Sequence, residues 1–294
     1  MTDRSQNPPR IFAGISEASL PYAIDLGHGV SLRPTYAHLF AANMMAFQKA
    51  ERGKPHPAPW KPARGGFAYD IQIELSVPTD IPLPGGRSAA EVIRLIASLL
   101  RLARYPYLMV PVTSDHPFDA AGAEDAPTLT PFETEPRIFV VPNNTRTEIT
   151  EEDLLWLKAV WPTVAELVRQ APQLETALHA CDACTVRGRA ASALLIAWGA
   201  LEEIFAPTPA ELRFRVSAHI AAYLEVPGPD RLERFKQVAQ LYNARSRIAH
   251  SAQDAGSREL VETFIVLRNA LMKIIDERAV PSQSDLERRL FCGS

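Results

Sequence analysis

The apolar positions in the first part of the chain follow two different periods. From Phe67 to Val77 every second residue is apolar, which is the pattern of a half-buried β-strand. Two shorter β-rich runs, Tyr107–Val112 and Arg137–Val141, are limited by prolines and predict short or edge strands. The run Ser88–Tyr105 instead places its aliphatic residues at helical spacing, and a further helix is predicted over Thr35–Lys49. The pattern therefore predicts a mixed α+β fold for this part.

From about Glu151 onward the apolar residues recur with a period of about 3.6, which predicts helices. Thr150, Thr208 and Ser282 each stand three positions before an acidic residue, the arrangement of a helix N-cap. The predicted helices cover residues 151–169, 173–205, 209–224, 230–250, 257–277 and 282–291. The second of them, 173–205, can break at Gly188.

Proline usage divides the chain at the same place. Of 25 prolines, 18 lie in residues 1–150 and 7 in residues 151–294. We therefore predict two domains. Residues 1–150 form a mixed α+β region of unknown function, for which sensing and substrate recognition are the candidate roles. Residues 151–294 form an all-α helical bundle with short connections.

Charge and composition narrow the range of partners. The net charge of −3 is spread as −1 over residues 1–150 and −2 over residues 151–294, so nucleic-acid binding requires a local patch. The N-terminus has no basic start followed by an apolar core, and no apolar run reaches the roughly 18–20 residues of a membrane span. Three cysteines are too few for a disulfide framework. We expect a cytoplasmic protein that does not contact a membrane.

The sequence contains no GxxxxGK[ST], GxGxxG, HExxH or GxSxG motif. His179, Cys181 and Cys184 form an HxCxxC cluster, but a tetrahedral zinc site needs four ligands and no second cysteine pair is present. The two nearby cysteines share one face of a helix, so we interpret them as buried small residues. No metal and no cofactor is predicted.

Two adjacent carboxylates, Glu202 and Glu203, follow an apolar run that ends at Leu201. Adjacent positions on a helix point about 100° apart, so a paired acid–base site is not expected. We expect one of them to face solvent and the other to be an inward polar anchor.

The most pointed chemical feature lies in the predicted helix 230–250. Leu241 and Ile248 belong to an apolar stripe at helical spacing, and Arg245 falls inside that stripe. A guanidinium among core-facing positions is costly unless it is paired or lines a cleft or subunit interface. His250 follows five residues later, about 140° further round an ideal helix. On these residues alone, a salt-bridged arginine and a surface histidine is also a consistent interpretation.

This segment resembles the R-x4-6-H motif of HEPN domains, and LYNARSRIAH, which contains Arg245 and His250, is similar to the ApeA-like branch. Three further segments follow the order and spacing of that branch. They are AWGALEEIF at 197–205, ELRFRVSAHIAAYLE at 211–225 and VETFIVLRNALMKII at 261–275. The resemblance covers roughly residues 190–277 and does not reach residues 1–150.

The resemblance implies a HEPN-like helical bundle that forms a homodimer and brings two motifs into one cleft. It also implies a metal-independent endoribonuclease acting on single-stranded RNA, in a toxin or phage-defence context, with an unidentified antitoxin or regulatory partner. Two alternatives stay open. One is a non-catalytic HEPN-like module for RNA binding or dimerisation, and the other is a regulatory protein that senses a ligand through residues 1–150.

The residue types fit the implied chemistry. His250 titrates near neutrality and can move protons to and from RNA, and Arg245 offers a fixed fork of donors to phosphate oxygens. Ser246 is an i, i+4 neighbour of His250 and is expected to orient it or to donate to phosphate. Arg247 is expected to bind substrate by positioning a phosphate. Residues 230–247 carry five basic and two acidic side chains, a modest local patch.

Overall fold

The computed structural model describes residues 9–119, 127–137, 147–186, 190–206, 211–250 and 257–293, without the side chains of Ala249, His250 and Ser257. Its sheet has six antiparallel strands in the order β2-β3-β4-β1-β5-β6. These strands are β1 (Arg10–Ser16), β2 (Ile24–Gly27), β3 (Val30–Ala46), β4 (Trp60–Pro78), β5 (Met109–Ser114) and β6 (Leu129–Pro131).

The strand predicted from Phe67 to Val77 is confirmed as part of β4. Ile71, Ile73 and Leu75 are fully buried, as the period-two pattern requires. The strand is not half-buried throughout, because Glu74 and Ser76 of the opposite face are buried as well and Phe67 is exposed. The run 107–112 is confirmed as the short strand β5, but β5 pairs with both β1 and β6 and is therefore not an edge. Of the run 137–141, only Arg137 lies within the described residues, where it forms an isolated bridge with Val186.

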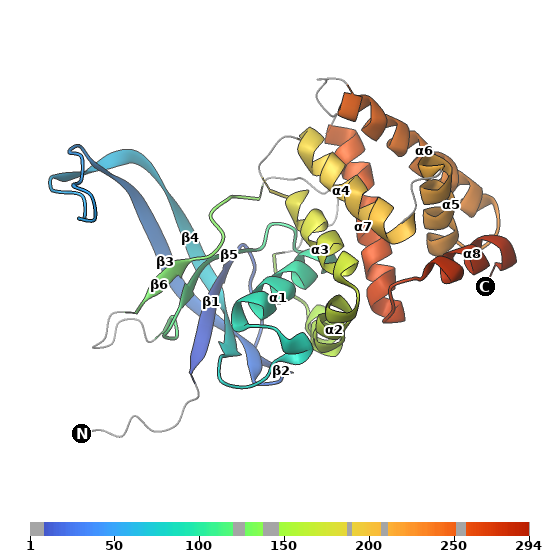
Figure 1. Ribbon diagram of the computed structural model, residues 1–294. Helices are drawn as coiled ribbons and strands as arrows, with labels where there is room; N and C mark the ends of the chain where they lie inside the picture. Colours follow the sequence, from blue (N-terminus) through green and yellow to red (C-terminus); the bar gives the residue numbers. More distant parts are fainter. Residues whose placement is uncertain are drawn as a thin grey trace.

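The helix predicted over Thr35–Lys49 is wrong, because these residues belong mainly to β3. Alanine, leucine and methionine favour a helix locally, but β3 pairs with β4 along nearly its whole length, from Ser31 opposite Ser76 to Ala46 opposite Trp60. The backbone hydrogen bonds of this ladder override the local preference. The two strands form a hairpin that projects beyond the rest of the sheet (Figure 1).

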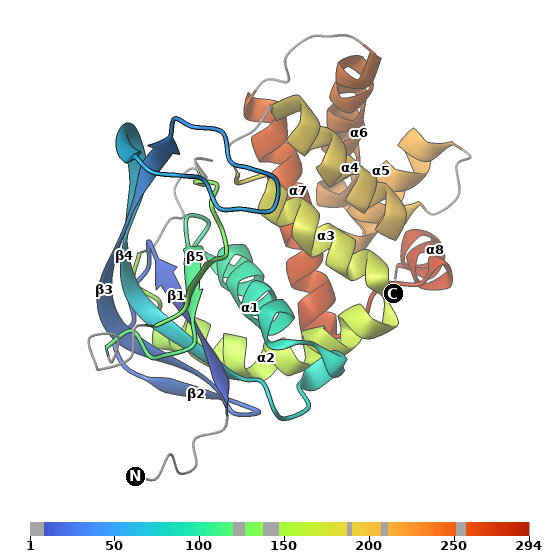
Figure 2. The same cartoon turned by 60° about the vertical axis from the view of Figure 1, so that its left-hand side comes forward.

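The helix predicted at Ser88–Tyr105 is confirmed as α1 (Ala89–Ala103). Ser88 accepts a hydrogen bond from the backbone N–H of Glu91, and the Glu91 carboxylate accepts one from the backbone N–H of Ser88. This capping box fixes the start of the helix. A 3-10 turn, η1 (Pro84–Gly86), precedes it. Figures 1 and 2 show α1 between the sheet and the helices that follow.

The predicted shift to helices after residue 150 is confirmed in the described part of the chain, where all six named strands lie before it. Thr150 and Ser282 cap helices as predicted. The cap predicted at Thr208, which itself lies outside the described residues, is wrong for α5, because α5 begins at Leu212 and its N-cap is Glu211 in the left-handed region. The long predicted helix 173–205 is two helices. The helices are α2 (Glu151–Gln170), α3 (Pro172–Ala183), α4 (Ala190–Phe205), α5 (Leu212–Leu224), α6 (Pro229–His250), α7 (Ser257–Glu277) and α8 (Gln283–Cys292).

One hydrophobic core runs through both halves of the chain, from Ala13 in the sheet to Leu286 in α8. Trp161 of α2 is fully buried and donates its indole N–H to the carbonyl of Leu26 at 2.9 Å. Arg268 of α7 donates to the carbonyl of Leu102 at the end of α1. The six named strands and α1 lie before residue 150 and the other α-helices lie after it, but this boundary does not separate two cores. Among the described helices, none is long and apolar enough to span a membrane.

Candidate functional site

Arg245 lies where α6 packs against α4. Val238 and Leu241 of the same helix are buried, and Ile248 packs against the core, so the predicted apolar stripe is confirmed. The Arg245 side chain is 27% exposed and forms an ion pair with Glu202 of α4, with 3.4 Å between its Nη2 and the Glu202 Oε1. The arginine is therefore paired within its own chain and still reaches solvent.

The Arg245–Glu202 pair is loose. Its two atoms fail hydrogen-bond geometry, and among the described residues Glu202 Oε1 and Arg245 Nε are buried atoms that have no hydrogen-bond partner. A second contact is a cation–π interaction, with the guanidinium carbon 5.6 Å from the centre of the Tyr242 ring. Buried charged groups normally satisfy their hydrogen bonds. This pair retains unused hydrogen-bonding capacity.

Aromatic rings form the inner wall beside this pair. Trp198 of α4 is fully buried and meets Tyr242 edge-on, with 5.2 Å between ring centres. Burial raises the pKa of Tyr242, and the negative charge of Glu202 raises this pKa further, so the phenol stays protonated at neutral pH. Trp198 and Tyr242 were not identified from the sequence. The sequence signal for both is helical spacing. Trp198 lies four residues before Glu202 and Tyr242 lies three residues before Arg245, so each ring shares a helix face with its charged neighbour.

The expectation for the adjacent carboxylates is confirmed. Glu203 is exposed, whereas the Glu202 side chain is 19% exposed and turns towards α6. Glu202 therefore belongs to the candidate site as the counter-charge of Arg245. The sequence indicated an inward anchor but not its partner, which lies 43 positions further along the chain.

Arg247 lies on a different side of α6 from Arg245. It is exposed and lines a groove of about 280 Å³ between α6 and α7. Arg258, Glu259 and Glu262 of α7 line the same groove, and Arg258 donates to Glu262 at 2.7 Å. Within one chain the structure therefore does not bring the two arginines of the motif together.

Ser246 is partly buried on α6. The backbone of His250 ends the same helix, but its side chain lies outside the described part of the structure.

Ion pairs largely neutralise the predicted basic patch at residues 230–247. Arg234 pairs with Glu225 at 2.9 Å, and Lys236 pairs with Glu233 at 2.7 Å. The guanidinium of Arg231 is bound to the carbonyl oxygens of Glu225 and Arg289. This face of the bundle is therefore only weakly positive.

The HxCxxC cluster does not form a site. Cys181 and Cys184 are buried, as interpreted from the sequence, whereas His179 is exposed on the other side of α3. Burial raises the pKa of the Cys184 thiol to about 12 and raises that of Cys181 as well, so both stay protonated. Within the described ranges no group of three or more metal-ligating side chains occurs.

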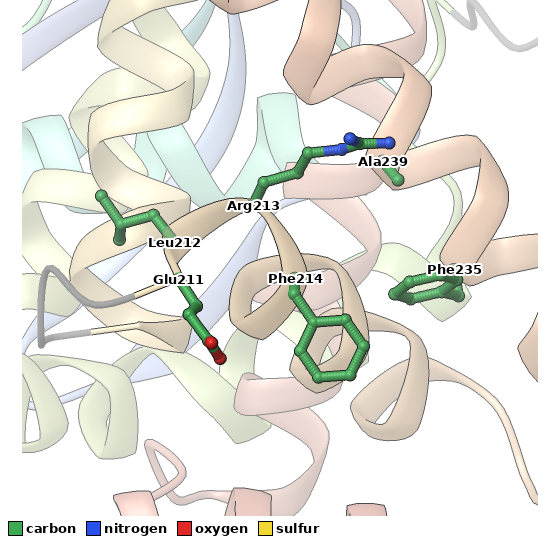
Figure 3. Close-up of a pocket in the computed structure, with 6 residues that line it drawn as sticks. All are labelled: Glu211, Leu212, Arg213, Phe214, Phe235 and Ala239. Carbon is green, nitrogen blue, oxygen red and sulfur yellow. The ribbon is translucent and has the colours of Figure 1, made fainter.

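An apolar hollow of about 770 Å³ lies where α5 begins beside α6. Figure 3 shows Phe214 of α5 and Phe235 of α6 turned towards one another, and their ring centres are 5.8 Å apart. Phe214 is 57% exposed. No local sequence pattern marks this hollow, because its two aromatic residues come from different helices.

No protein-family model matches this chain, and no curated protein and no solved structure matches it either. The resemblance to HEPN domains therefore stays a prediction from the motif and the order of its neighbouring segments.

Proposed function

We propose that this protein is a metal-independent endoribonuclease that cleaves single-stranded RNA through Arg245 and His250 of α6. The observation that carries the proposal is the state of Arg245. It sits in the apolar stripe of α6, keeps part of its surface in solvent and is bound to Glu202 without hydrogen-bond geometry. A phosphate oxygen is a better acceptor for its fork of donors than this loosely placed carboxylate.

In the proposed reaction His250 removes the proton of the ribose 2′-OH, and the protonated His250 of a second copy of the chain donates a proton to the leaving 5′ oxygen. Arg245 stabilises the extra negative charge on the phosphate in the transition state. The bond between phosphorus and the 5′ oxygen breaks as the 2′ oxygen attacks, which leaves a 2′,3′-cyclic phosphate. Ser246 orients His250 or donates to the phosphate, and Arg247 holds a neighbouring phosphate in the groove that it lines.

A homodimer is part of this proposal. A partly exposed arginine on a mostly buried stripe fits the rim of a subunit interface. A second copy packed along α6 places two Arg245 side chains near one cleft. The two guanidinium groups together offset the negative charge of the two Glu202 carboxylates. Sedimentation at micromolar concentration measures this state directly, and we expect a dimer.

The Arg245–Glu202 ion pair also favours one alternative, a non-catalytic helical module that binds RNA or a protein. In that alternative the arginine serves only to join α6 to α4. Glu202 then has a structural role, and no chemistry is assigned to His250.

The first prediction separates these two functions. Purified protein is expected to cleave single-stranded RNA in EDTA and to leave 2′,3′-cyclic phosphate ends. His250→Ala is expected to slow cleavage by about 10²–10⁴-fold, the range for loss of a general acid or base. Arg245→Lys keeps the charge but loses the bidentate fork, and we expect a loss of about 10²-fold or more.

Glu202→Gln is the matched control, because it removes the partner of Arg245 and leaves Arg245 and His250 in place. Cleavage retained in Glu202→Gln and lost in Arg245→Lys, at equal melting temperatures, supports the enzyme. Equal melting losses in these two variants, with no cleavage by the unaltered protein, support the structural module. Cleavage that is unchanged in His250→Ala excludes the proposed mechanism.

A further inference from the structure

The hairpin of β3 and β4 carries a surface that the proposed catalytic site does not use. Residues 36–69, here called the arm, comprise the outer parts of both strands and the turn between them. β2 pairs with β3 only as far as Leu32, and β1 pairs with β4 only from Ile73 onward. The arm therefore has no strand beside it on either edge within the described sheet. Figure 1 shows its tip far from the helical bundle.

Large apolar side chains are exposed along the whole arm. Tyr36 and Phe40, which are 67% and 69% exposed, stand on one face of β3 at alternate positions. The others are Met44, Met45, Phe47, Trp60 and Phe67, each between 37% and 64% exposed. Within the arm no second layer covers them in the described structure. Exposed rings concentrated in this way indicate a binding surface.

The same segment concentrates positive charge. The arm contains five basic residues and one acidic residue, Glu51, which gives it a net charge of +4. Because the whole chain carries −3, the remaining residues carry −7. The basic residues are Lys49, Arg52, Lys54, Lys61 and Arg64, and all five are exposed. Among the described residues, Lys54 is the one member of this set that forms an ion pair, with Glu51 at 2.5 Å.

We propose that the arm binds single-stranded nucleic acid. Bases stack on exposed aromatic rings regardless of their sequence, and neighbouring cations neutralise the phosphates between them. The arm supplies both kinds of group in one extended element. The alternation of β-strand side chains repeats every 6–7 Å or so, a spacing that an extended strand of nucleotides can follow.

Two other occupants fit the surface less well. A second copy of the arm brings a like charge of +4, which opposes pairing of the two arms. A lipid surface requires apolar side chains at the tip with cations behind them. Here the tip carries Phe47 beside Lys49, Arg52 and Lys54, and further rings such as Phe40 and Phe67 lie on the stem, so rings and cations are interleaved along the arm and the rings are not gathered at its tip. The order of charges and rings therefore favours a polyanion that lies along the arm.

The second prediction tests this binding with the full-length protein and fluorescent oligonucleotides of about 15 nucleotides, a length within the usual site sizes. RNA and DNA of the same sequence are compared by anisotropy in EDTA. DNA has no 2′-OH and cannot undergo the proposed cleavage, so its binding is independent of the proposed function. We expect both to bind, with an affinity that falls steeply as salt increases.

Two sets of variants separate the contributions of rings and cations. Phe40→Ala and Trp60→Ala are each expected to weaken binding by about 5- to 150-fold, the range for loss of one stacking platform. Lys61→Ala with Arg64→Ala is expected to flatten the slope of log affinity against log salt by about 1.4, since each phosphate contact contributes about 0.7. Phe291→Ala and Arg288→Ala, exposed residues of α8, are the matched controls and are expected to bind normally.

Each outcome bears on the proposal. Loss of binding in the arm variants with normal binding in the α8 variants supports it, whether or not the protein cleaves RNA. Absence of binding by the unaltered protein overturns it, and so does binding that survives all three arm changes. If the arm variants instead convert a dimer into a monomer in sedimentation, the arm is a protein interface and the proposal is wrong.

Discussion

At the scale of single residues, Arg101 of α1 is a buried charge that joins several parts of the fold. Its side chain is 3% exposed and lies between two carboxylates, 2.5 Å from Glu133 and 2.9 Å from Asp182. It also donates to the carbonyl of Leu108 at 2.9 Å. These contacts join α1 to α3 and to the segment that follows β6. Removing one partner of a buried ion pair costs folding free energy, because the remaining charge has neither its counter-charge nor water to solvate it.

The third prediction therefore concerns Arg101→Met. The thioether fills much of the same volume but leaves Glu133 and Asp182 without their common partner, and we expect a loss of about 3 kcal/mol in the free energy of unfolding. Urea denaturation followed by circular dichroism measures it. Arg169→Met is the control. It breaks an exposed ion pair with Glu166, and its cost is expected to be below about 1 kcal/mol. Equal losses in the two variants would contradict this account of Arg101.

Residue positions were predictable from the sequence where periodicity alone decides them. Arg245 was placed in an apolar stripe from the spacing of its neighbours, and Cys181 was placed in the core in the same way. Their partners were not predictable. Glu202 meets Arg245 only because α4 and α6 pack together, and no local pattern records that contact. For the same reason the sequence did not distinguish the buried Arg101 from Arg94, which is exposed on the same helix.

At the scale of elements, the helices after residue 150 were predictable because apolar residues recur there at helical spacing and because Thr150 and Ser282 cap two of the helices. The strand β3 was not predictable. Its residues favour a helix locally, and its extended form depends on hydrogen bonds to β4 that begin at Ser31 opposite Ser76. Such long-range pairing leaves no signal within a window of ten residues.

Two glycines provide the fourth prediction, since the same substitution has opposite effects at the two positions. Gly66 in β4 has φ of +153°, and a Cβ there would lie 2.4 Å from the carbonyl oxygen of Ala41 in β3. Gly66→Ala is expected to weaken the arm ladder by about 1–3 kcal/mol. Gly199 lies in α4 with no atom within 4 Å of an added Cβ, and Gly199→Ala is expected to stabilise the helix by about 0.5–1 kcal/mol.

Hydrogen exchange resolved by peptide distinguishes these effects. Faster exchange is expected in the arm of Gly66→Ala, and slower exchange in α4 of Gly199→Ala. Unchanged exchange throughout the arm of Gly66→Ala would show that β3 and β4 do not approach as closely as described.

At the scale of the whole molecule, the two predicted domains share one core. The sequence indicated a boundary near residue 150 because the period and the proline content change there. Those signals report local conformation and not packing. Trp161 shows the difference, because it lies in α2, the first helix after residue 150, yet packs against the turn after β2. Its ring meets that of His28 edge-on at 5.5 Å between centres.

The fifth prediction follows from this shared core. Trp161→Ala removes a fully buried ring and its hydrogen bond to Leu26, and we expect a loss of about 3–5 kcal/mol in the free energy of unfolding. Because the core is continuous, amides in the sheet and in α7 should lose protection from hydrogen exchange together. Two separate unfolding transitions, with α7 unaffected by the substitution, would instead establish two independent domains.

The unequal charge of the arm and the rest of the chain has a consequence for how the molecule meets other molecules. A net +4 at one end and −7 elsewhere gives the protein a permanent electric dipole along its length. Within roughly a Debye length of a polyanion, about 8–10 Å at physiological salt, the field of the polyanion exerts a torque on this dipole. The torque turns the arm towards the polyanion. The first contact is then made by the arm, while the acidic body is held back. If the arm binds RNA as proposed, an RNA chain long enough to reach α6 is already tethered when it meets Arg245, and its local concentration, not its bulk concentration, governs that encounter.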